Sequence, residues 1–160
     1  MSELLRSVAF LASLSMCACG GDISPPSDTA VLDFFKQNRA EVYSFVQFCE
    51  ENTDVRVIGE SPGETTGAWS SAYPEDTAVE SIRALMNKMN VKALSCTHDG
   101  SLPTTPLISV VIQLYRKGTS FSSTMSGIIF FTTDGSHIED AQKRGELKSL
   151  GEQGWYMYSL

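Results

Sequence analysis

The two longest runs of apolar, β-branched and aromatic residues lie in the second half of the chain, at 107–115 and 125–133. Strands buried on both faces have this composition, and the polar segment 116–124 between the runs can reverse the chain. The pattern therefore predicts two neighbouring antiparallel strands at the centre of a sheet. Neither run contains the side chains that catalysis would require. We therefore interpret both runs as part of the hydrophobic core.

Helical periodicity precedes these strands twice. Between 29 and 51, apolar residues recur near the 3.6-residue spacing, directly after Ser27 and Asp28, either of which can cap a helix. A second apolar stripe runs through 77–90, and Glu80 stands three residues after its first position, as in a capping box. Each segment is predicted to be one amphipathic helix.

Shorter segments complete the pattern. Residues 55–58 and 91–97 are strand-like, and the terminal 155–158 has the aromatic content of a strand. The segment 138–150 is ambiguous, since it suits either a charged helix or, at its end, a hairpin with the terminal strand across the turn 151–154. We prefer the hairpin.

This order of elements contains too few strand–helix alternations for a doubly wound sheet. It predicts a single α+β domain over 28–160, with an antiparallel sheet of about five to six strands and two helices on one face. A chain of 160 residues is long enough to bury a core of its own.

The N-terminus has the pattern of a bacterial export signal. The apolar run 8–16 is too short to span a bilayer but suits the h-region of a signal peptide. It leads into Met16-Cys17-Ala18-Cys19, which resembles the lipobox of bacterial lipoproteins, where a small residue precedes the lipidated cysteine. Cys19 fits this pattern and Cys17 does not, because the bulky Met16 precedes it.

The resemblance implies that residues 1–18 are a signal peptide and that Cys19 receives acyl chains such as palmitate. Residues 19–27 are small, polar and proline-bearing, and would form the lipidated tether. We expect a lipid anchor in the membrane of the bacterial cell envelope, facing the periplasm or the cell surface. A plain secretory signal is the alternative.

The charge balance narrows the choice of partners. The formal net charge is −7, and basic residues adjoin each other only as pairs. Nucleic-acid binding needs clustered basic side chains to neutralise phosphates, so we expect no nucleic-acid partner. An acidic surface favours a cationic protein partner, although a merely solvated surface has the same composition.

Two cysteines follow the lipidation site, Cys49 late in the first predicted helix and Cys96 in a predicted strand. Exported proteins meet an oxidising environment, in which an even number of cysteines commonly pairs. We therefore expect a Cys49–Cys96 disulfide, with two buried free thiols as the alternative.

The long segment 59–74 between the first strand and the second helix is rich in Gly, Ser, Thr and Pro. Loops of this length in compact domains are often functional, so Trp69 and Tyr73 mark a possible binding surface. The competing interpretation is that both aromatic side chains fold back onto the core.

Signals for catalysis are weak. Gly59-Glu60-Ser61-Pro62-Gly63 matches G-x-S-x-G, but the residues that follow forbid the helix that a nucleophile elbow requires. Only two histidines exist, His98 and His137, and both lie in predicted turns. A catalytic role for either is the alternative to surface positions. No zinc-ligand spacing or glycine-rich phosphate loop is present, so we expect neither a metal nor another cofactor.

A family resemblance adds to this interpretation. Ser126-Gly127-Ile128-Ile129-Phe130 and Trp155-Tyr156-Met157-Tyr158 are similar to segments of small uncharacterised bacterial proteins, many of them lipoproteins. Those proteins carry a late K-G-[apolar]-x-[aromatic] strand and end in W-Y-x-Y, and Ser126 stands here in place of the usual Lys. The resemblance implies the central strands and the terminal hairpin, but no activity.

The sequence thus predicts a membrane-tethered, non-enzymatic binding or structural module. A sharper form of this hypothesis is an inhibitor or immunity-type partner of a cationic envelope protein. The alternative is a small envelope enzyme of hydrolase type that uses His98 or His137.

Overall fold

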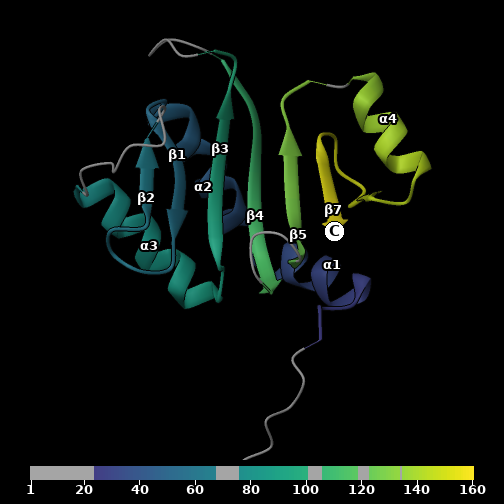
Figure 1. Cartoon of the computed structure of the whole chain (residues 1–160), viewed down its shortest axis with the longest axis horizontal. Helices are drawn as coiled ribbons and strands as arrows, with labels where there is room; N and C mark the ends of the chain where they lie inside the picture. Colours follow the sequence, from purple (N-terminus) through teal and green to yellow (C-terminus); the bar gives the residue numbers. More distant parts are fainter. Residues whose placement is uncertain (1–23, 68–75, 101–105, 119–122, 134) are drawn as a thin grey trace, which may run out of the picture.

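The computed structural model of the protein describes residues 24–67, 76–100, 106–118, 123–133 and 135–160. In these residues it has four helices and a seven-stranded antiparallel sheet, which is the predicted α+β class with a somewhat larger sheet (Figure 1). The helices are α1 (Asp28–Gln37), α2 (Arg39–Glu51), α3 (Thr77–Met89) and α4 (Ser136–Lys143). The strands are β1 (Val55–Gly59), β2 (Thr65–Gly67), β3 (Ala93–His98), β4 (Leu107–Lys117), β5 (Thr124–Phe131), β6 (Leu147–Ser149) and β7 (Trp155–Ser159). Their order across the sheet is β2-β1-β3-β4-β5-β7-β6.

The two long apolar runs form β4 and β5 at the middle of the sheet, as predicted. They pair antiparallel, with Val110 opposite Phe130 and Ile112 opposite Ile128. The predicted terminal hairpin is also present, since β7 pairs with β5 on one side and with β6 on the other. The start of the ambiguous segment 138–150 is helical as part of α4, so each interpretation describes a part of it.

The first predicted helix is not continuous. It ends at Gln37 and resumes at Arg39, because Asn38 leaves the helical conformation with φ −116° and ψ 29°. The Asn38 side-chain amide donates to the carbonyl of Phe34 at 2.9 Å, next to its own backbone N–H, which donates to the same oxygen. Such local hydrogen bonds let Asn compete with the helix, so α1 and α2 meet the sheet as separate segments.

Two clusters of buried side chains cover the two faces of the sheet. The larger one joins α1, α2 and α3 to inward residues such as Val110, Ile112 and Trp155. The smaller one joins Ile138 of α4 to residues of the opposite face, among them Tyr158. The predicted helical segments therefore share one face, and α4, which the preferred prediction lacked, covers part of the other.

The predicted long loop after β1 contains a strand. β2 pairs antiparallel with β1, and the turn between them closes through Gly59 N–H to the Glu64 carbonyl at 3.1 Å. Ser61 lies in this hairpin turn, and its backbone N–H donates to the Glu64 carboxylate. No helix follows Ser61 directly, so it lacks the backbone setting of a nucleophile elbow.

Candidate functional site

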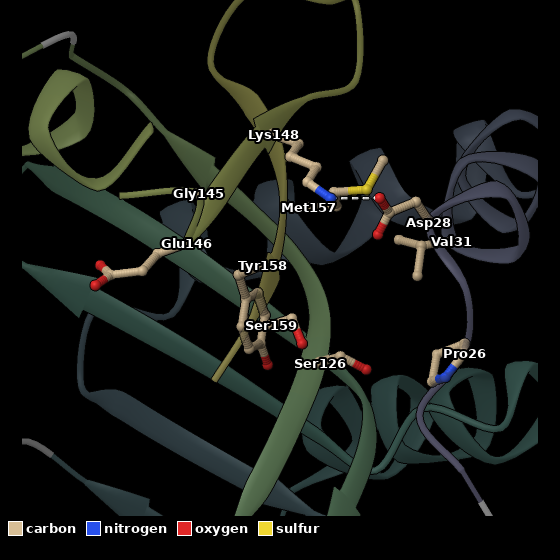
Figure 2. A pocket seen from close by; sticks show the side chains of 10 residues that line it. All are labelled: Pro26, Asp28, Val31, Ser126, Gly145, Glu146, Lys148, Met157, Tyr158 and Ser159. Atoms are coloured by element: carbon tan, nitrogen blue, oxygen red, sulfur yellow. Dashed lines mark hydrogen bonds and ion pairs between the residues drawn. The ribbon is translucent and has the colours of Figure 1, made fainter. Parts of the chain in front are cut away.

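A small open hollow lies at the corner where the chain enters the domain, between the start of α1 and the ends of β5, β7 and β6 (Figure 2). Turn residues after α4 close its far side. Its walls are formed by Pro26, Asp28, Val31, Ser126, Gly145, Glu146, Lys148, Met157, Tyr158 and Ser159. We call it the corner hollow.

Ser126 is the polar group of the corner hollow without a partner. Its side chain is buried, with 3% of the residue exposed, and its hydroxyl is the one buried side-chain polar atom without a hydrogen bond among the described residues. In Figure 2 the hydroxyl points toward Pro26. An unpaired buried hydroxyl costs free energy, and structures usually place such groups where water or a ligand satisfies them.

Strand pairing explains the position of Ser126. It lies opposite Ser159 in the β5–β7 ladder, while Met157 lies opposite Ile128. Met157 and Val31 belong to the main core, so they give the corner hollow an apolar wall beside its hydroxyl groups. A ligand here would therefore meet both apolar contacts and a hydrogen-bonding group.

Ion pairs of both signs surround the mouth. Lys148 of β6 contacts Asp28 of α1 at 2.5 Å, and Figure 2 shows this pair reaching from strand to helix. Arg144 donates two hydrogen bonds to Glu146, at 2.7 and 2.8 Å. These bonds raise the pKa of Arg144 and, together with its positive charge, lower the pKa of Glu146. The Arg144–Glu146 pair therefore stays charged near neutral pH.

Tyr158 does not supply a base to this site. Burial raises the pKa of its hydroxyl to about 12, so the phenol keeps its proton at neutral pH. The corner hollow thus offers hydroxyl groups and exposed carboxylates, but no group titrating near neutrality lines it. This set is suited to binding more than to proton transfer.

His98 is not the surface histidine that the sequence predicts, because it ends β3 with 6% of its surface exposed. Its Nε2 lies 2.9 Å from the Cys49 carbonyl oxygen, and its Nδ1 contacts the guanidinium of Arg56. Both ring nitrogens are therefore occupied. This arrangement gives His98 a structural role and leaves no lone pair directed at solvent.

His137 is exposed in the first turn of α4, so its surface position agrees with the prediction. Its ring packs edge-on against Phe131 at a centroid distance of 5.7 Å. Among the described residues, no hydrogen bond joins its side chain to a nucleophile. The two histidines lie on different elements, β3 and α4, and no described contact brings them together.

Cys49 and Cys96 form the predicted disulfide, with their Cα atoms 5.5 Å apart. Both residues are buried, so the bond ties α2 to β3 inside the main core. Trp69, Tyr73 and Cys19 lie outside the described residues. Their assignments to a binding surface and to lipidation remain predictions.

Two further observations concern the part of the chain that the structure describes. It contains no group of three or more His, Cys, Asp or Glu side chains placed to hold a metal ion. It also contains no helix long and apolar enough to cross a membrane.

Comparison with known proteins returned no family, no curated protein and no solved structure that matches the chain. The geometry of the corner hollow is therefore the basis for its interpretation.

The sequence did not predict the corner hollow, because its lining residues come from four separate segments of the chain. The one available signal was Ser126, a hydroxyl group beside the apolar run of β5.

Proposed function

We propose that the protein is a lipid-anchored lipoprotein of the bacterial cell envelope and that its folded domain is a non-enzymatic binding module. The observation that carries this proposal is the buried Cys49–Cys96 disulfide. Disulfides persist in oxidising compartments, and the lipobox-like sequence at Cys19 directs the chain to such a compartment. The disulfide and the lipobox-like sequence thus support the same location.

The binding surface is proposed to be the corner hollow. It combines an unpartnered hydroxyl at Ser126, an apolar wall and exposed carboxylates at Asp28 and Glu146. The net charge of −7 favours a cationic protein partner, because opposite charge accelerates encounter and helps specificity. An inhibitor or immunity-type role toward a basic envelope protein fits this chemistry.

Lipidation is tested by mass spectrometry of the membrane fraction. The expected wild-type product begins at Cys19 and carries acyl chains, whereas Cys19→Ser remains unmodified. A wild-type protein that is soluble and lacks any lipid would contradict the anchor, while leaving the binding surface open to test.

Partner binding is tested by affinity capture from envelope extracts. Wild type is compared with Asp28→Lys/Glu146→Lys, which reverses the charge at the mouth, and with Asp33→Lys/Glu80→Lys, which makes the same change at exposed positions elsewhere. We expect a basic protein to be captured by wild type and by the control pair, and lost from the mouth variant. Equal capture by all three would exclude the corner hollow as the contact surface.

A further inference from the structure

The contact of His98 with Arg56 and Cys49 has fixed hydrogen-bond roles. A guanidinium can only donate and a backbone carbonyl can only accept. The Nδ1 atom of His98 must therefore accept from Arg56, while its Nε2–H donates to the Cys49 carbonyl at 2.9 Å. Only the neutral ring with its proton on Nε2 satisfies both partners.

The same contact joins three parts of the fold. Arg56, in β1, also donates to the carbonyl of Thr53 at 3.0 Å and, at a longer 3.4 Å, to that of Gly100 beyond the end of β3. Cys49 lies near the C-terminus of α2, where carbonyl groups lack partners within the helix. We call His98, Arg56 and the three carbonyls of Cys49, Thr53 and Gly100 the His98 latch.

A second proton on His98 is incompatible with this arrangement. It would place an N–H on Nδ1 against the N–H of Arg56 and set two positive charges side by side. Burial of the ring lowers the pKa of His98 from its ordinary 6.5, and the Cys49 hydrogen bond raises it. The charge of Arg56 lowers the same pKa further, and that of Asp54 raises it. Cys49 and Cys96 do not titrate, because they form the disulfide.

We propose that the His98 latch is a pH-sensitive switch, in which protonation of His98 displaces Arg56 toward solvent and frees the turns at Thr53 and Gly100. Arg56 is half-buried, so it can reach water without unfolding the core. The disulfide keeps β3 attached to α2 while the latch opens. The switch is therefore a local opening at one end of the sheet, and it is independent of the proposed anchor and binding surface.

The sign of the effect follows from the lowered pKa of His98. The unfolded chain binds the proton more readily than the folded one, so the latch contributes fully above pH 6.5, the ordinary histidine value. Its contribution decreases as the pH falls from there through the folded-state pKa. Opening thus needs a more acidic solution than a solvated imidazole would need.

The first test is an NMR titration of the two histidine rings in the full chain, with His137→Gln to assign the signals. We expect His98 to titrate below the ordinary histidine value of 6.5, and we expect Arg56→Met to move the His98 midpoint upward, because a positive neighbour is removed. A His98 midpoint at or above 6.5, and unchanged in Arg56→Met, would overturn the proposal.

The second test is amide hydrogen exchange of segments 49–56 and 98–100, corrected for the intrinsic effect of pH. Between about pH 7.5 and about pH 5, wild type should lose protection there by roughly tenfold or more, while the sheet centre keeps its protection. His98→Gln retains a donor for Cys49 but cannot titrate, so its protection should not change with pH. If it fails to fold, Arg56→Met serves instead, with low protection at both pH values. Wild-type protection that is independent of pH would also refute the switch.

Discussion

Gly127 of β5 lies opposite Gln113 of β4, beside an irregularity in their register between Gln113 and Tyr115. A Cβ atom added to Gly127 would come within 2.1 Å of the backbone oxygen of Ile112. Backbone cannot move aside as a flexible side chain can, so this glycine is required for space.

The first prediction follows from this close approach. Gly127→Ala should lower the free energy of unfolding by about 2 kcal/mol, the usual scale of overpacking. Denaturant unfolding measures the change, and Thr124→Ala, at an exposed position of the same strand, is the matched control with an effect below about 0.5 kcal/mol. A Gly127→Ala protein as stable as the control would show that β4 and β5 can separate at no cost.

Asp76 is the N-cap of α3, one residue before the capping-box position that the sequence suggests. Its carboxylate accepts from the backbone N–H groups of Ala78 and Val79, both at 3.0 Å. The predicted capping box from Thr77 to Glu80 is therefore wrong by one residue. The geometry assigns the N-cap to Asp76.

Asp76→Ala should therefore destabilise the domain by about 1 kcal/mol, the typical value of an N-cap. Asp76→Asn keeps an oxygen acceptor and should recover most of the loss. Thermal unfolding of the three proteins checks this. If Asp76→Ala matched wild type while Thr77→Val did not, the cap would belong to Thr77.

At the scale of elements, α2 is tied to the β6–β7 hairpin through an aromatic and polar chain. The Trp155 Nε1–H donates to the Tyr43 hydroxyl at 3.3 Å, and that hydroxyl donates to Glu152 at 3.0 Å. Arg39 also contacts Glu152 at 3.0 Å. Trp155 itself is fully buried and packs against Phe35, Phe130 and Tyr43.

Tyr43→Phe should cost about 1 kcal/mol, because it removes the partner of a buried indole N–H. This value is at the low end of the cost of leaving a buried donor without an acceptor, since Tyr43 is 43% exposed and water can partly replace its hydroxyl. Glu152→Gln keeps an acceptor for Tyr43 and should change stability by less than about 0.5 kcal/mol. Urea unfolding followed by fluorescence distinguishes the two variants, and an equal cost for both would assign the effect to charge.

Some of these elements can be predicted from a short stretch of sequence, and others cannot. β4 and β5 can be predicted from their own residues, because both faces of those strands are buried and their sequences are continuously apolar. The break between α1 and α2 at Asn38 cannot be predicted in this way. The apolar spacing continues through it, and a side-chain hydrogen bond of Asn38 ends the helix. β2 was missed, and α4 was considered only as the alternative to the hairpin, because a three-residue strand and a largely charged helix depend on their neighbours.

The candidate site was less predictable than the fold for the same reason. The disulfide could be expected from the number of cysteines and the predicted export signal, and it is present. His98 was placed in a turn because Asp99 and Gly100 follow it, but β3 extends far enough to bury it. The corner hollow forms where α1 meets β5, β6 and β7. These elements are far apart in the sequence, so no short motif predicts it.

At the scale of the whole molecule, a disulfide crosslinks the helical layer to the sheet. The Cys49–Cys96 disulfide closes a sequence separation of 47 residues that includes β1, β2 and α3. A crosslink over such a span restricts the unfolded chain strongly, and the chain-entropy treatment assigns it on the order of 4 kcal/mol. Few single contacts in a domain of this size approach that value.

Cys49→Ala/Cys96→Ala should therefore lower the free energy of unfolding by about 4 kcal/mol, mainly by making the unfolded state more favourable. Equilibrium urea unfolding under non-reducing conditions measures this loss, and wild type with added thiol reductant should fall close to the double variant. Retention of wild-type stability in the double variant would mean that the buried alanines and the α2–β3 packing hold the layers together by themselves. Single substitutions are poor controls, since each leaves an unpaired thiol that unfolding exposes under the non-reducing conditions of the measurement.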